Sequence, residues 1–190
     1  MDYNEIISNT EVFGIERAFK ASKYPMATDL SKVNSDYTDR INSLAMTDKG
    51  EGHDNFLLGI VVQFDLTFTV KAWTEEERYH FIDIISSQST MHKISQFDLD
   101  KAYIHYTDDI IVNRMKELVA EYNADPTPEK YLTVLYSNPC GFRLTAGMTT
   151  NYRQLKTIYS QRKNHRLPEW KAFCKWIESL PYSELITGNR

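Results

Sequence analysis

A run of basic side chains near the end of the sequence is the feature with the clearest chemical potential. Between Asn151 and Trp176 there is one acid, Glu169, and there are seven bases: Arg153, Lys156, Arg162, Lys163, Arg166, Lys171 and Lys175. This segment carries +6, and the other 15 bases and 25 acids carry −10, although the formal net charge of the chain is only −4. Such segregation predicts an anionic partner at the C-terminal helices, either a nucleotide phosphate or a nucleic-acid backbone. A solvated helix face would produce the same pattern without a partner.

Arg162 is the base whose place on its helix is unusual. Residues eleven apart on an α-helix lie within about 20° of each other, so Asn151 and Arg162 bracket a stripe that contains Leu155 and Ile158. Two interpretations are open. In the first, Asn151 and Arg162 both reach solvent from the helix ends, as long arginine stems do. Alternatively, Arg162 points into a cleft and offers a planar, permanently charged fork to a ligand carbonyl or phosphate.

Two helices and a strand are expected to position these bases. The first helix covers about 151–163, and the second begins at Pro168, a residue favoured in the first turn. The apolar face of the second helix comprises Trp170, Phe173, Cys174, Ile177 and Leu180. Alternating apolar and polar residues over 62–70 predict a half-buried strand, and 142–148 is a candidate for a second, shorter strand.

The remaining helices follow from capping signals and apolar periodicity. Thr74-Glu75-Glu76-Glu77 has the pattern of a capping box and predicts a helix over 75–85, followed by a loop over 86–97. Helices are also expected over 110–122 and 128–136. One long strand, a short second strand and five or six helices predict an α+β fold.

The length and composition indicate one domain. The chain has 190 residues, of which 42% are hydrophobic, and this suits a single domain with a buried core. We expect residues 1–54 to form a weakly patterned N-terminal segment of that domain and residues 55–190 to form its core. Within the N-terminal segment, short helices are expected near 14–21 and 37–46.

Several kinds of site and location are excluded by residue usage. Cys140 and Cys174 show no CxxC spacing, so the sequence predicts neither a disulfide framework nor a zinc ribbon, and a reducing, cytoplasmic compartment is expected. The most apolar stretch, 56–62, is far shorter than the roughly 20 residues of a membrane helix. The five histidines show no ligand spacing, and the aspartates within 98–109 are expected to cap helices, so no metal site is predicted.

Four segments carry a resemblance to a known family. Residues 52–56, Gly-His-Asp-Asn-Phe, are similar to the family's Gly-His-Glu-x-x-x-Phe segment, and residues 88–92 lie where the family has Glu-x-Ser-x-Arg-Tyr. The strand over 61–71 and the helix after it follow the family's order of elements. Asn151-Tyr152-Arg153-Gln154-Leu155, with Arg162 eleven residues after Asn151, matches the Asn-x-Arg-x-Leu-x6-Arg helix most specifically. From about residue 52 onward, the chain resembles the flavin-dependent thymidylate synthases, and more closely their small, diverged relatives carried by phages of Gram-positive bacteria.

The resemblance implies central antiparallel strands flanked by helices, together with a set of ligands. Members of the family bind FAD and deoxyuridylate (dUMP) in pockets shared between the subunits of a homotetramer. They methylate the pyrimidine with methylenetetrahydrofolate and a reduced nicotinamide cofactor. By resemblance, His80, Asn151 and Arg153 bind the flavin, and Ser89 holds the nucleotide phosphate. Arg162 binds the substrate pyrimidine and is the catalytic residue, because a fixed positive charge stabilises negative charge that develops beside it.

Several family positions hold different residues in this sequence. Tyr79-His80-Phe81 stands at the family's Arg-His-Arg signature, so only the histidine is kept. Met91 replaces a phosphate-binding arginine, whose role Lys93 can take over, and Ser87 replaces the glutamate. Each lost charge-assisted contact costs about 1.5–3 kcal/mol, against about 8 kcal/mol for a micromolar affinity. We therefore predict a retained nucleotide-binding scaffold that binds FAD weakly, and the prediction does not extend to synthase catalysis.

Two functional hypotheses follow from the sequence. The first is a diverged thymidylate-synthase-like phage protein with a cleft for dUMP or flavin around Arg162, Ser89 and His80. The second is a non-enzymatic phage protein that has reused the scaffold and inhibits a host or defence nuclease, in the manner of an anti-CRISPR protein, through its basic C-terminal helices. Both place the protein in the host-cell cytoplasm without a membrane partner, and the resemblance implies a homo-oligomer.

Overall fold

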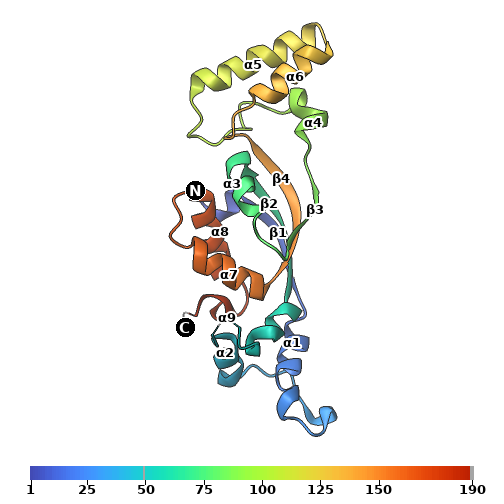
Figure 1. Ribbon diagram of the computed structural model, residues 1–190, viewed down its shortest axis with the longest axis vertical. Coiled ribbons are helices and arrows are strands. Elements are labelled where there is room, and N and C mark those ends of the chain that lie inside the picture. The colour runs from blue at the N-terminus through green and yellow to red at the C-terminus, as the bar shows by residue number, and fades with distance from the viewer. Residues whose placement is uncertain (49, 189–190) are drawn as a thin grey trace. The chain divides into compact units, whose positions relative to one another are not determined.

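The computed structural model describes residues 1–48 and 50–188, and the chain divides into two compact units (Figure 1). The first unit comprises residues 1–66, 79–85 and those from 147 onward. The second unit comprises residues 67–78 and 86–146. Each unit brings together segments that are far apart in the sequence, so neither corresponds to a continuous stretch of chain.

A four-stranded antiparallel sheet organises the fold. Its strands are β1 (Ile7–Phe13), β2 (Val61–Thr69), β3 (Ile82–Ser87) and β4 (Arg143–Asn151), in the order β1-β2-β4-β3. In the antiparallel pair of β1 and β2, Ile7 lies opposite Leu66 and Val12 opposite Val62. A register shift between Ser8 and Glu11 marks a bulge in β1.

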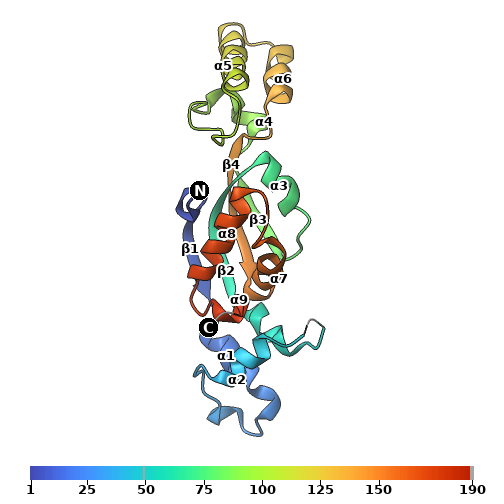
Figure 2. The same ribbon diagram turned by 90° about the vertical axis from the view of Figure 1, so that its left-hand side faces the viewer.

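In the first unit, α7 (Tyr152–Arg162) and α8 (Pro168–Ser179) lie against one face of the sheet, as Figure 2 shows. The expected alternation is confirmed in β2, where Val62, Phe64 and Leu66 are buried and the residues between them are half-buried. The ring of Phe64 lies 6.0 Å from that of Phe173, a residue of the predicted apolar face, and 4.4 Å from that of Trp176, both on α8. The apolar face predicted for the second C-terminal helix therefore covers the strand that the sequence showed most clearly.

The N-terminal part of the first unit consists of short helices. They are η1 (Tyr3–Glu5), α1 (Ile15–Ser22), η2 (Tyr24–Met26), η3 (Leu30–Lys32), α2 (Asp39–Ala45) and η4 (His53–Gly59), and α9 (Glu184–Thr187) follows α8. The rings of Phe19, Tyr37 and Tyr182 pack together with centroids 5.0 to 5.5 Å apart. The helices expected near 14–21 and 37–46 are thus confirmed as α1 and α2.

Gly14 joins β1 to α1 in a conformation that other residues rarely adopt. Its φ is +83°, and an added Cβ would lie 2.2 Å from the carbonyl oxygen of Gly59. We expect Gly14→Ala to lower the free energy of unfolding by about 2–4 kcal/mol, because it adds left-handed backbone strain and displaces a neighbouring carbonyl. Urea unfolding measures the loss. Gly50→Ala is the control, since its added Cβ meets nothing within 4 Å. In that variant only the backbone strain of about 1–2 kcal/mol is expected. An equal loss of stability in both variants would contradict a role for the close approach to Gly59.

The second unit has its own apolar core. Its helices are α3 (Val70–Glu76), α4 (Thr90–Lys93), η5 (Ile94–Gln96), α5 (Asp109–Ala124) and α6 (Pro128–Ser137). The buried cluster comprises Ile94, Leu99, Ala102, Met115, Leu118, Val134 and Phe142. Asp108 caps α5 and Thr127 caps α6, each through a side-chain oxygen that accepts a backbone N–H. The helices expected over 110–122 and 128–136 are confirmed by α5 and α6.

The expected helix over 75–85 is wrong. The helix begins at Val70, because the hydroxyl of Thr69 accepts a hydrogen bond of 3.1 Å from a backbone N–H in its first turn. Thr74, expected to be the cap, lies inside the helix and donates its hydroxyl to a backbone carbonyl. The chain then enters β3, which covers Ile82–Ser87. Residues 86–97 are likewise not one loop, since they include the end of β3, α4 and η5.

The described part of the chain contains neither a membrane-spanning helix nor a metal-binding cluster. Among the described residues, none of the helices combines the length and apolar character of a membrane-spanning helix. In the same part of the chain, no three His, Cys, Asp or Glu side chains gather in an arrangement that could hold a metal ion.

Candidate functional site

Arg162 is held by aromatic side chains at the end of α7. Its Nε donates a hydrogen bond of 2.6 Å to the hydroxyl of Tyr79. Its guanidinium carbon lies 4.7 Å from the ring centre of Trp170 and 5.3 Å from that of Tyr79, within the range of cation–π attraction. The Tyr79 hydroxyl donates in turn to Oε1 of Gln161 at 2.9 Å. The guanidinium is therefore fixed and half-buried, and it does not extend freely into solvent.

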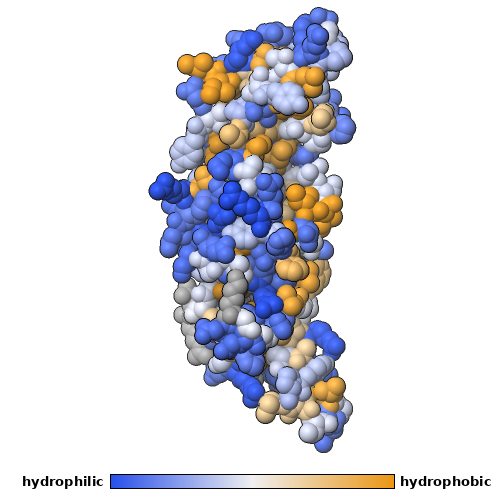
Figure 3. Space-filling model, viewed as in Figure 1, coloured by the Kyte–Doolittle hydropathy of each residue, from blue (hydrophilic) through white to orange (hydrophobic). Residues whose placement is uncertain are grey.

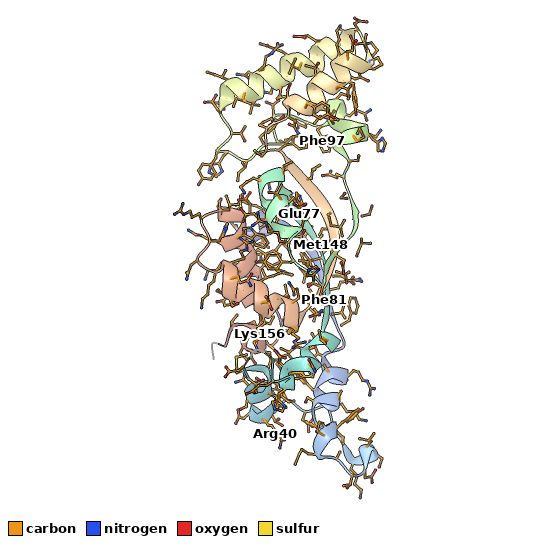
Figure 4. The ribbon with its side chains drawn as sticks, viewed as in Figure 1. Arg40, Glu77, Phe81, Phe97, Met148 and Lys156 are labelled. Carbon is orange, nitrogen blue, oxygen red and sulfur yellow. The ribbon has the colours of Figure 1, made fainter. Side chains whose placement is uncertain are left out.

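The two neighbours of Tyr79 are less enclosed. His80 is exposed, and Phe81 is 67% exposed with a φ of +64°. The hydroxyl of Thr150 on β4 donates to the Phe81 carbonyl oxygen at 2.8 Å, which holds this strained turn into β3. In Figure 4 the side chain of Phe81 points away from α7. The residues at the family's Arg-His-Arg signature thus supply a phenol, an exposed imidazole and an exposed ring.

Asn151 and Arg153, the expected flavin contacts, both have partners in the first turn of α7 or beside it. Oδ1 of Asn151 accepts a hydrogen bond of 2.9 Å from the backbone N–H of Gln154, so Asn151 is the N-cap of the helix. Nε of Arg153 lies 3.1 Å from Oδ1 of Asp54 on η4. The prediction that Asn151 begins this helix is confirmed, and the side-chain oxygen is engaged by that role.

Asp54 is a buried acid that forms ion pairs with two of the seven bases. It is 6% exposed, and besides Arg153 it pairs with Lys156, whose Nζ lies 3.2 Å from Oδ2. Lys156, labelled in Figure 4, also donates to the carbonyl oxygen of Ala45 on α2. The side chains of Arg153 and Lys156 are 35% and 24% exposed. This partly buried cluster connects α7 to η4 and α2. The positive charges of Arg153 and Lys156, which the sequence alone would predict to bind a ligand, therefore neutralise Asp54.

Ser89 lies in the second unit and lines a cavity of about 400 Å³. The cavity is lined by Gln88, Ser89, Lys93, Gln96, Phe97 and Asp98. Nζ of Lys93 donates to Oε1 of Gln96 at 3.1 Å. The pKa of the Asp98 carboxyl is lowered from its ordinary value, mainly by hydrogen bonds from Lys101 and from the Asp100 backbone. A hydroxyl, an ammonium and an aromatic ring therefore line one cavity together with the Asp98 carboxylate. The first three groups are able to receive a phosphate next to a flat group.

Comparison with solved structures identifies the fold. Two crystal structures of the flavin-dependent thymidylate synthase of Helicobacter pylori, both containing FAD and dUMP, match this structure with a TM-score of 0.76. They cover 98% and 96% of this chain and 97% and 96% of their own, at 12% sequence identity. This chain has the fold of the flavin-dependent thymidylate synthases. The predicted α+β fold of that type is confirmed. No protein-family model matches the sequence, and a comparison with curated proteins also finds no match.

Three residues that the sequence did not single out shape this thymidylate-synthase-like scaffold around α7. In the sequence, Tyr79 is notable only because it replaces an arginine of the family's signature. Asp54 belongs to a motif, and Trp170 belongs to the apolar face of a helix. The hydrogen bond from Arg162 to Tyr79 spans 83 positions, and the contact from Lys156 to Asp54 spans 102. No local pattern signals contacts over such separations. The hint in the sequence is that Asp54 stands at the glutamate position of the family's Gly-His-Glu segment.

Proposed function

We propose that this protein binds a pyrimidine nucleotide and holds its phosphate in the Ser89–Lys93 cavity of the second unit. The observation that carries the proposal is that Ser89 and Lys93 line one cavity of about 400 Å³. A hydroxyl donor beside an ammonium suits a phosphate, since hydrogen bonds to an ionised oxygen are short and strong. The enzyme of Helicobacter pylori contains dUMP in its crystal structures, so dUMP is the first ligand to test.

Arg162 is a second proposed contact, and it rests on the resemblance. A guanidinium whose position is fixed by Tyr79 and Trp170 needs little reorganisation to polarise a pyrimidine carbonyl. Because Arg162 belongs to the first unit and Ser89 to the second, the two contacts are proposed separately.

FAD is the cofactor that the resemblance implies, and the residues present fit it poorly. Tyr79 and Phe81 supply no charge at two of the three signature positions, His80 is exposed, and Arg153 is paired with a buried acid. At about 1.5–3 kcal/mol for each lost charge-assisted contact, only weak binding of FAD is expected. We therefore propose nucleotide binding and derive no flavin-dependent step.

The test is titration of the whole protein with dUMP by isothermal calorimetry. We expect saturable binding that weakens about tenfold in Ser89→Ala and in Lys93→Gln, because each variant removes a donor to the phosphate. Lys130→Gln is the control, since Lys130 pairs with Asp125 at 2.7 Å on another part of the second unit. Affinities unchanged by Ser89→Ala and Lys93→Gln would contradict the proposal. The visible spectrum of the purified protein tests the expectation for FAD, which predicts no strong flavin band.

A second candidate function is the inhibition of a host or defence nuclease by a non-enzymatic, phage-encoded protein on this scaffold. It is favoured by the exposed bases of the C-terminal helices together with the loss of the signature cations. Absence of dUMP binding together with binding to an acidic protein or nucleic acid that weakens steeply with salt would support it. Under either function we propose a homo-oligomer in the host cytoplasm, and light scattering tests the oligomer.

A further inference from the structure

The seven bases of the C-terminal segment separate into two groups in the structure. Arg153 and Lys156 pair with Asp54, and Arg162 lies against Tyr79 and Trp170. The other four are exposed: Lys163, Arg166, Lys171 and Lys175. Figure 3 shows hydrophilic side chains over α7 and α8. Three of the bases thus contact buried or half-buried side chains, and four lie at the surface.

A cavity of about 330 Å³ lies among the exposed bases, within the first unit. Its polar lining comes from the end of α7 and from α8, and consists of Tyr159, Lys163, Asn164, Lys171, Lys175 and Glu178. Three lysine side chains therefore line one small cavity, and Glu178 is the single acid among the described residues that line it. It is separate from the Ser89–Lys93 cavity, which belongs to the second unit.

Glu178 compensates only one of the three lysines. Its Oε2 lies 2.8 Å from Nζ of Lys175, and its Oε1 accepts a hydrogen bond of 2.9 Å from the Tyr159 hydroxyl. The pKa of Glu178 is lowered, first by the hydrogen bond from Lys175, so the carboxylate is ionised at neutral pH. The lining side chains keep a net charge of +2, from the ammonium groups of Lys163 and Lys171.

The two remaining ammonium groups have no acidic partner in the described part of the chain. Nζ of Lys163 lies 5.8 Å from the ring centre of Tyr159, and the side chain of Lys171 makes no hydrogen bond or ion pair with the described residues. Because Glu178 offsets the charge of Lys175, the uncompensated ammonium groups of the cavity are those of Lys163 and Lys171. A bound anion would offset these two charges.

We propose that this cavity is a second anion site, which binds a terminal phosphate or pyrophosphate group through Lys163, Lys171 and the amide of Asn164. Ammonium groups are compact charges with three donors each, and they suit the oxygens of a multiply charged phosphate. Two uncompensated positive charges match a dianion better than a monovalent carboxylate. The phosphate can come from a free nucleoside polyphosphate or from the 5′ end of a nucleic acid.

Calorimetric titration of the full chain with inorganic pyrophosphate tests the proposal. We expect binding that weakens about fivefold or more in Lys163→Gln and in Lys171→Gln, because each removes a charged donor. Glu178→Gln is expected to bind pyrophosphate more tightly, since Glu178 is the one acid among the described residues that line the cavity. This opposite sign separates a ligand-binding role from a structural one. Lys32→Gln is the matched control, because Lys32 is an 83% exposed lysine of the first unit outside the cavity.

Further arms separate this site from the Ser89–Lys93 cavity and identify the source of the phosphate. Ser89→Ala is expected to leave pyrophosphate affinity unchanged. If Ser89→Ala abolishes binding and Lys171→Gln does not, or if no binding is detected, the proposal is overturned. A nucleoside triphosphate and two oligonucleotides, one with a 5′ phosphate and one with a 5′ hydroxyl, are then compared. Preference for the 5′ phosphate indicates a nucleic-acid end, and preference for the triphosphate indicates a free nucleotide. Equal affinity for both oligonucleotides, with loss in Lys171→Gln, would replace a terminal-phosphate site by a backbone-binding surface and contradict the proposal.

Discussion

Replacement of Asp54 by alanine is expected to lower the free energy of unfolding by about 3–5 kcal/mol. Asp54 is 6% exposed and lies 3.1 Å from Nε of Arg153 and 3.2 Å from Nζ of Lys156. Removing the acid leaves two partly buried cations next to each other without a counter-charge. The loss is large because an unpaired, poorly solvated charge costs more than the ion pair contributes when it is intact.

Urea unfolding followed by circular dichroism measures this effect. Lys32→Ala is the matched control, because it also deletes one partner of an ion pair in the first unit, with Asp29 at 3.5 Å. That pair is exposed, so we expect no measurable change. A second variant, Asp54→Ala combined with Lys156→Met, removes one of the stranded charges and is expected to recover part of the loss. Equal stability of the single and double variants would show that charge is not the cause.

The cluster of Asp54, Arg153 and Lys156 also shows what a count of charges in the sequence cannot predict. The seven bases were correctly counted as an excess, but a count cannot separate Arg153 and Lys156, which neutralise an interior acid, from Lys171, which faces solvent. The distinction depends on η4 lying against the start of α7, and these segments are separated by about a hundred positions. Ion pairs between residues so far apart in the sequence produce no periodic pattern from which they could be predicted.

The strands show a related limit. β2 was predictable because every second residue is buried, and this gives the strand its period of two. β1 and β3 are the outer strands of the sheet, and in each only the first residue is fully buried. Without one-sided burial there is no selection for alternation, so the sequence gives no strand signal. The error at 75–85 follows from this, since Ile82–Ser87 was assigned to the preceding helix.

The helices show that apolar periodicity predicts the buried residues of a helix only where that face packs against the rest of the protein. The predicted face of α8 is buried throughout, from Trp170 to Leu180. The apolar residues of α5 behave differently: Ile110 and Ile111 are 79% and 45% exposed, and Met115 and Leu118 are the buried residues of the helix. On α7 the stripe was correct for Leu155 and Ile158. What it could not supply was the partner of Arg162, because Tyr79 was expected to lie inside a helix.

Trp170→Ala is the second change with a large expected effect, a loss of about 3–5 kcal/mol in the free energy of unfolding. The indole is fully buried, with the ring of Phe173 at 5.6 Å, that of Tyr79 at 5.9 Å and the guanidinium of Arg162 at 4.7 Å. Its removal leaves a cavity and takes away the surface on which Arg162 rests. Trp170→Phe keeps an aromatic face and is expected to cost less, since a smaller cavity remains.

A double-mutant cycle separates the packing of Trp170 from its support of Arg162. The cycle combines Trp170→Phe with Arg162→Met and measures unfolding of the four proteins in urea. We expect a coupling energy of about 0.5–2 kcal/mol, because the indole is the best platform for a cation and the site is half-buried. Coupling near zero would mean that the indole does not position the guanidinium, and the 2.6 Å hydrogen bond to Tyr79 is then the contact to test. In that case Tyr79→Phe, which removes only the hydroxyl, would release Arg162, and the aromatic residue at the family's first signature position would be the one that fixes the proposed pyrimidine contact.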